Sequence, residues 1–116
     1  MGEVHSVSVY HAHDGKLDKV HQLSAQDSIG ILYSLVTLHL GFDFNADEYK
    51  IMGLAPYGDA ERFRSFFDEA VQLRPDGTIH IPMLRLNQTR DERENYLRTR
   101  QHLTEHLSKE RRPEEE

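Results

Sequence analysis

The chain has 116 residues, no cysteine and a formal net charge of −6 at pH 7. This allows one domain and excludes disulfides, thiolate chemistry and the basic surface that a nucleic-acid backbone requires. Because no apolar run approaches the roughly 18–20 residues of a membrane-spanning helix, we expect a cytoplasmic protein without nucleic-acid or membrane partners.

A β-hairpin is predicted near the N-terminus. In residues 4–23, apolar and polar side chains alternate on both sides of the dipeptide Asp14-Gly15. The alternation places Val7 and Val9 on one face, as in a half-buried strand. Asp-Gly favours a tight turn, so we expect two antiparallel strands.

Three helices are predicted to follow the hairpin. In residues 27–40, apolar side chains recur at helical spacing, with Ser24 or Asp27 as a possible N-terminal cap and Gly41 at the C-terminal end. This helix is apolar around much of its circumference, so we expect it to be buried on more than one side.

The second and third helices are shorter. Residues 48–55 form the second, which Asn45 or Asp47 would cap and which Pro56 would end. Asp59 would cap the third, an amphipathic surface helix in the sequence DAERFRSFFDEAVQL.

The rest of the chain is predicted as one short strand and a polar tail. The turn sequence RPDG precedes a strand at residues 78–81, which Pro82 ends. Residues 87–116 have few apolar positions, so we expect a polar, partly disordered helical tail.

Candidate binding residues lie at the start of two helices. The carboxylate of Glu48 could accept hydrogen bonds from ligand hydroxyls, such as those of a ribose; alternatively, Glu48 only favours the helix dipole and Lys50 is solvated. Gly30 lies in a first helical turn, where glycine costs about 1 kcal/mol relative to alanine. Either close approach of a ligand or tight helix packing would explain that glycine.

Two histidine pairs could ligate a metal. His11 and His13 share one face of a strand, and His102 and His106 share one face of a helix. Each pair supplies too few ligands for a complete site, so solvated histidines are the simpler interpretation. Because the sequence has no phosphate-binding loop, dinucleotide-binding motif or nucleophile elbow, no catalytic residue is assigned.

Residues 27–59 resemble a block of a known enzyme family. Their sequence, DSIGILYSLVTLHLGFDFNADEYKIMGLAPYGD, is similar to the block SLGxLYSxxTxxLGFxxxxxEYKxMGLAPYG of the ATP-dependent O-carbamoyltransferases, which carbamoylate nodulation factors and antibiotics. The resemblance implies an α/β fold, as a fragment of an actin-like, RNase-H-like ATPase domain. Residues 1–86 would be part of the nucleotide-binding domain and residues 87–116 the tail.

The resemblance also implies a two-step reaction. Carbamoyl phosphate and ATP give carbamoyl-adenylate, and the carbamoyl group then passes to an acceptor hydroxyl. Contacts to ATP or carbamoyl-adenylate would come from Ser28, Gly30, Glu48, Lys50 and Gly53. Three residues of the same block are expected in the core instead: Tyr33, Met52 and Leu54.

The resemblance further implies an internal fragment. The family's histidine motif for a divalent metal is expected upstream of this segment, and its carbamoyl-adenylate-forming domain is expected downstream. We therefore expect no metal ligands in this chain and no catalysis by it alone.

Two other interpretations stay open: a non-catalytic interaction module completed by a partner chain, and a degenerate, truncated product. A fragment of an actin-like fold would expose sheet edges and the apolar back of residues 29–40. We therefore expect either self-association or a complementing chain.

Overall fold

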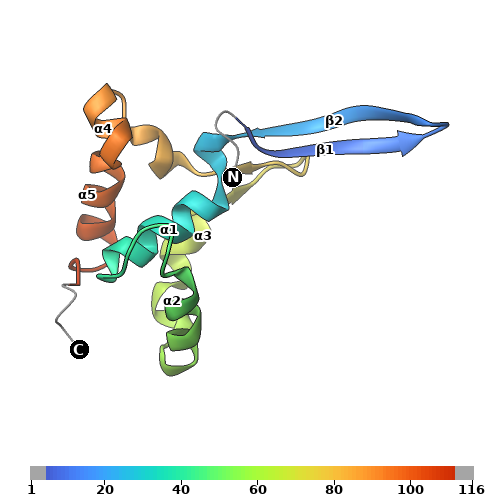
Figure 1. Ribbon diagram of the computed structural model, residues 1–116. Helices are drawn as coiled ribbons and strands as arrows, with labels where there is room; N and C mark the ends of the chain where they lie inside the picture. Colours follow the sequence, from blue (N-terminus) through green and yellow to red (C-terminus); the bar gives the residue numbers. More distant parts are fainter. Residues whose placement is uncertain (1–4, 112–116) are drawn as a thin grey trace.

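The computed structural model describes residues 5–111, in which a long β-hairpin projects from a helical body (Figure 1). The radius of gyration is 16.2 Å, and the principal extents are 56 × 36 × 27 Å. A compact domain of this length has a radius of gyration of roughly 13 Å. The molecule is therefore elongated, and the projecting hairpin is a visible reason.

The hairpin consists of β1 (His5–His13) and β2 (Lys16–Ser24), as the alternating sequence predicts. Both turn residues adopt positive φ, 48° at Asp14 and 72° at Gly15. Such a turn matches the natural twist of paired strands, which explains the tight connection.

Helix α1 (Ile29–His39) follows a short 3₁₀ turn, Ala25–Asp27. Neither predicted cap is correct: Ser28 caps α1, its hydroxyl accepting a hydrogen bond from the Ile31 N–H at 3.3 Å. Ser24 caps the 3₁₀ turn instead, and the Asp27 side chain is buried. Local sequence could not separate these two closely spaced helix starts.

The end of α1 agrees with the prediction. Gly41 adopts a φ of 87°, and its N–H donates to the Leu38 carbonyl at 2.9 Å. Residue 111 reinforces this end, because the Arg111 N–H donates to the His39 carbonyl at 2.9 Å and its Nη1 to the Leu40 carbonyl at 2.8 Å.

Helix α2 (Glu48–Leu54) starts and ends close to the predicted positions. Asp47 occupies the cap position, but its carboxylate makes no capping bond and accepts from the Asp43 N–H at 3.0 Å instead. Pro56 ends the α-helix, and the chain continues as the 3₁₀ turn Ala55–Tyr57.

The third predicted helix forms as a 3₁₀ turn, Ala60–Phe63, followed by α3 (Arg64–Ala70). Asp59 caps the turn as predicted, since its Oδ1 accepts from the Glu61 N–H at 3.1 Å.

The predicted strand at residues 78–81 is reduced to β4 (Ile79–His80). It pairs antiparallel with β3 (Gln72–Leu73), which the sequence analysis did not predict. The segment after β4 is the 3₁₀ helix Pro82–Leu86.

The chain then forms α4 (Arg90–Asn95) and α5 (Leu97–His106). A capping box starts α4: Thr89 accepts from the Glu92 N–H, and Glu92 accepts from the Thr89 N–H. These bonds, with one from Arg98, lower the pKa of Glu92 to about 2.

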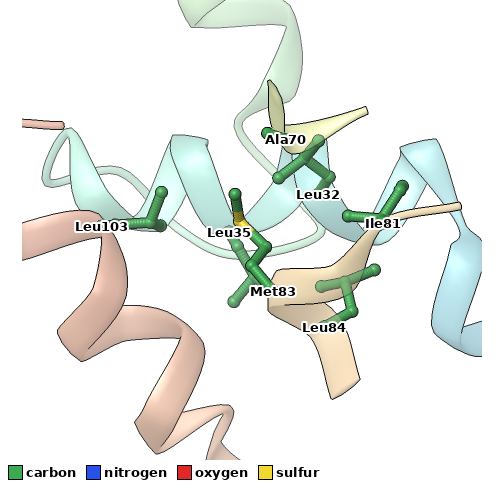
Figure 2. Close-up of a cluster of buried hydrophobic side chains, with 7 residues drawn as sticks. All are labelled: Leu32, Leu35, Ala70, Ile81, Met83, Leu84 and Leu103. Atoms are coloured by element: carbon green, nitrogen blue, oxygen red, sulfur yellow. The ribbon is translucent and has the colours of Figure 1, made fainter. Parts of the chain in front are cut away.

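The core lies along α1, where buried side chains from four parts of the chain meet (Figure 2). Helix α1, α3, the segment after β4, and α5 contribute Leu32, Leu35, Ala70, Ile81, Met83, Leu84 and Leu103. The predicted burial of α1 is thus confirmed.

Helix α5 contributes more to this core than its polar composition suggests. Leu103 and Thr99 are fully buried, and the Thr99 hydroxyl donates to the Met83 carbonyl at 2.6 Å. Asn87 donates to the same hydroxyl at 2.8 Å. The last predicted tail residues, 112–116, lie outside the described residues.

The described residues confirm the mixed α/β composition; the actin-like assignment stays a prediction. Within residues 5–111, no helix is both long and apolar enough to cross a lipid bilayer.

Candidate functional site

A cavity of about 560 Å³ lies between α1 and α2. The loop between the two helices turns back with positive φ at Gly41 and Asn45. Phe44 in this loop packs against Tyr96, with 5.9 Å between ring centroids, which links the loop to the start of α5. The cavity is lined by Ile29, Gly30, Tyr33, Ser34, Asn45, Glu48, Tyr49 and Met52.

Glu48 supplies the negative charge of the cavity. Its Oε1 accepts a hydrogen bond from the Ser34 hydroxyl at 2.6 Å. This bond, followed by bonds from the backbone of Glu48 and Asn45, lowers the pKa of the Glu48 carboxyl. Because its pKa is lowered, Glu48 is ionised at neutral pH. A carboxylate accepts about four hydrogen bonds, so Glu48 can accept another from a ligand.

The other walls of the cavity are mainly apolar and accessible. Tyr33 and Met52 were expected in the core, but they are 40% and 65% exposed and face this cavity. Leu54, also expected in the core, is exposed as well. Helix α2 has no fully buried residue, so its apolar side chains do not serve this core.

The structure brings together two of the five residues predicted to contact the nucleotide. Gly30 and Glu48 line the cavity from α1 and α2. Ser28 does not line it, because its hydroxyl caps α1.

The other two predicted residues point to different environments. The ammonium of Lys50 lies 3.0 Å from Asp47 Oδ1, and this hydrogen bond raises the pKa of Lys50. At Gly53, an added Cβ would meet no described atom within 4 Å, so packing within residues 5–111 does not require glycine there. Their ligand roles stay predictions.

Sequence reasoning missed Ser34 and Asn45. Ser34 follows Gly30 by four residues, so both lie on the same face of α1, and this spacing could have identified it. Asn45 was considered only as a cap. Its position depends on a φ of 59°, which the sequence did not indicate.

An ionic cluster around the buried Asp27 fixes the start of α1. Arg85 forms two bonds to Asp27, at 2.5 Å to Oδ1 and 2.9 Å to Oδ2. The Ile81 N–H also donates to Asp27 at 3.0 Å, and His80 Nδ1 lies 3.2 Å from the same carboxylate. Burial raises the pKa of Asp27, but the bonds from Arg85 and Ile81 together outweigh it, so the pKa is lowered.

Within each of the two histidine pairs, the two rings lie close together. Ring centroids are 4.9 Å apart for His11 and His13 and 4.4 Å apart for His102 and His106. Among residues 5–111, no group of three or more His, Asp or Glu side chains is arranged to hold a metal ion.

These features define a mixed α/β protein with an open, carboxylate-bearing cavity between two helices. The family model of the carbamoyltransferase N-terminus matches residues 1–115. The chain belongs to this family, which confirms the resemblance in residues 27–59.

Three relatives show how much of a longer protein the chain represents. It is 34% identical over 87 residues to the uncharacterized protein sll1178 of Synechocystis sp., which covers 75% of this chain and 14% of that protein. It is 41% identical over 63 residues to the nodulation protein NolNO of Sinorhizobium fredii, covering 54% of this chain and 9% of that protein. It is 38% identical over 60 residues to the nodulation protein NolO of Bradyrhizobium diazoefficiens, covering 52% of this chain and 11% of that protein. The chain thus spans at most 14% of the length of these relatives.

Proposed function

We propose that this chain provides the adenosine-binding part of a carbamoyltransferase nucleotide site. The observation that carries the proposal is the cavity between α1 and α2, where the ionised Glu48 faces an otherwise mainly apolar lining. Membership in the carbamoyltransferase N-terminus family supports the class of reaction.

The size and lining of the cavity suit a nucleoside. Its volume of about 560 Å³ lies within the roughly 300–1,000 Å³ of typical small-molecule sites, which combine apolar walls with a few polar groups. The ring of Tyr33 or Tyr49 offers a face for stacking of the adenine base. Glu48 would accept a hydrogen bond from a ribose hydroxyl, with Ser34 keeping its carboxylate in place.

The charges indicate which end of the nucleotide would bind. The lining residues include no lysine or arginine, so the cavity lacks the cations that phosphates usually require. Lys50 would have to leave Asp47 to reach a phosphate. We therefore assign only the nucleoside end to this chain and the phosphates to other parts of a longer protein.

In the longer protein, carbamoyl phosphate and ATP would give carbamoyl-adenylate, with phosphate released from carbamoyl phosphate and pyrophosphate released from ATP. The acceptor hydroxyl oxygen would then bond to the carbamoyl carbon, with AMP as the leaving group. Residues of this chain would bind and orient the nucleoside, and we assign no described residue a role at the reacting atoms. No three or more His, Asp or Glu side chains within residues 5–111 are grouped to hold a metal ion, and we assign no step to the family's divalent metal.

The proposal is tested by AMP binding to the Glu48→Gln variant, measured by isothermal titration calorimetry. Glutamine has the same size but removes the charge, so we expect AMP affinity to fall about tenfold, the usual scale for losing a hydrogen bond to a charged group. Glu94→Gln is the control, since Glu94 is an exposed glutamate on α4 that pairs with Arg90. Equal affinity of the wild type and Glu48→Gln would contradict the assignment.

A further inference from the structure

Three side chains from separate segments of the chain meet beside the start of α1. Asp27 lies directly before the residue that caps α1, His80 ends β4, and Arg85 belongs to the 3₁₀ helix Pro82–Leu86. Within residues 5–111, the side-chain hydrogen bonds and ion pairs of His80 involve only Asp27 and Arg85. Its strand partner on β3, Gln72, carries no charge.

The contact with Arg85 fixes the protonation state of the His80 ring. Arg85 Nη1 lies 2.8 Å from His80 Nδ1, and a guanidinium group can only donate hydrogen bonds. Nδ1 must therefore be the acceptor, so the imidazole is neutral and carries its hydrogen on Nε2. The second hydrogen of Nη1 is donated to Asp27 Oδ1, at 2.5 Å.

This arrangement holds two acceptors close together. His80 Nδ1 and Asp27 Oδ1 are 3.2 Å apart, within the range of an N–H···O hydrogen bond, but no hydrogen lies between them while Arg85 donates to both. A proton on Nδ1 would replace the bond from Arg85 by a contact between two cations. The Asp27 carboxylate would then be in place as an acceptor for that proton.

We propose that His80 is a proton-sensitive switch at the start of α1. In the neutral state, Arg85 bridges Asp27 and His80. When Nδ1 takes up a proton from water, His80 donates to Asp27 Oδ1 and Arg85 Nη1 leaves both partners. Arg85 is the group that leaves because its side chain is 36% exposed, compared with 19% for His80 and 7% for Asp27.

The switch lies next to the cavity between α1 and α2 in the sequence of contacts along α1. Ser28 follows Asp27 and caps the helix, and the next two residues, Ile29 and Gly30, line the cavity. An exchange of the partner of Asp27 therefore acts on the segment that leads into the cavity wall. The switch does not depend on nucleotide binding.

NMR of the imidazole nitrogens of the isotope-labelled wild-type chain, from about pH 8 to about 5, tests the proposal over the range in which histidine ordinarily titrates. At the upper pH, we expect His80 Nδ1 to have the chemical shift of an unprotonated nitrogen and Nε2 that of a protonated one. As Nδ1 takes up its proton, the guanidinium signals of Arg85 and the amides of residues 28–30 should shift with the same midpoint. A hydrogen on Nδ1 at the upper pH, or Arg85 signals that do not follow the His80 titration, would overturn the proposal.

The variant His80→Asn separates the switch from other effects of pH. The asparagine side-chain oxygen can replace Nδ1 as an acceptor but does not titrate, so the pH-dependent shifts of Arg85 and residues 28–30 should disappear. His106→Asn is the matched control, because the His106 side chain is 58% exposed on α5, and it should keep these shifts. Shifts that persist in His80→Asn, or that disappear equally in both variants, would also overturn the proposal. The wild-type measurement of the His80 ring needs no variant.

Discussion

The buried carboxylate of Asp27 joins two segments that are far apart in the sequence. Its bonds to Arg85 and to the backbone of Ile81 hold the start of α1 against the segment after β4. Removing one partner of a buried ion pair costs about 3–5 kcal/mol, because the other charge stays buried without compensation. Since the Arg85 side chain is 36% exposed, the lower end of this range applies.

Asp27→Asn should therefore lower the free energy of unfolding by about 3 kcal/mol at pH 7, measured by urea denaturation. The control is Glu61→Gln, which removes a carboxylate from the exposed Glu61–Arg64 pair and should leave the unfolding midpoint unchanged. Equal destabilisation by the two variants would show that burial of the Asp27 pair has no energetic importance.

The pH dependence of this difference follows from the lowered pKa of Asp27. The unfolded chain binds the proton more readily than the folded chain, so the Asp27 contribution is present above the ordinary pKa of 3.8 and is lost as pH falls through the lowered value. The stability gap between wild type and Asp27→Asn should thus narrow as pH falls below 3.8. A gap that widens as pH falls below 3.8 would contradict this account.

Individual residues were predicted well only where their role is local. Asp59 and Gly41 act within a few residues of their own position, and both predictions are confirmed. Asp27 was assigned as a cap because a local pattern cannot reveal a partner 58 residues away.

At the scale of elements, α5 has the least obvious contribution. Its sequence is mostly polar, yet Leu103 is fully buried among side chains of the core. The buried polar side chains of Asn87 and Thr99 are hydrogen-bonded: Asn87 donates to the Thr99 hydroxyl, which donates to the Met83 carbonyl. Their burial therefore leaves neither side chain without a hydrogen-bond partner.

Leu103→Ala should destabilise the protein by about 3 kcal/mol, since it leaves a cavity at a fully buried site. Leu97→Ala is the control in the same helix; Leu97 is 40% exposed, and its truncation should cost about 0.5 kcal/mol. Thermal and urea unfolding of both variants measure the difference. Similar small losses would mean that α5 is not part of the cooperative core.

The sequence predicted those elements that have a strong period of their own. The hairpin and α1 have such periods and were found close to the predicted positions. The pairing of β3 with β4 and the docking of α5 depend on contacts between distant segments, which composition does not encode.

At the scale of the whole molecule, the helical body and the hairpin serve different purposes. The body packs α1 at its centre and forms the cavity, while the hairpin extends away from it (Figure 1). Helix-start chemistry and the family resemblance both pointed to Glu48 and Gly30, but the cavity itself depends on the loop that returns α2 to α1. Its positive φ at Asn45 and the contact of Phe44 with Tyr96 could not be predicted from local pattern.

The central claim is that the cavity between α1 and α2 binds the adenosine end of a nucleotide. An amide-resolved NMR titration of the full chain with AMP, and separately with ATP and Mg²⁺, tests it most directly. We predict shifts that cluster on residues 29–34 and 45–52 and that are similar for the two nucleotides, because the cavity lacks cations for the additional phosphates. A well-dispersed spectrum in which these residues do not shift, or in which the shifts cluster elsewhere, would contradict the account.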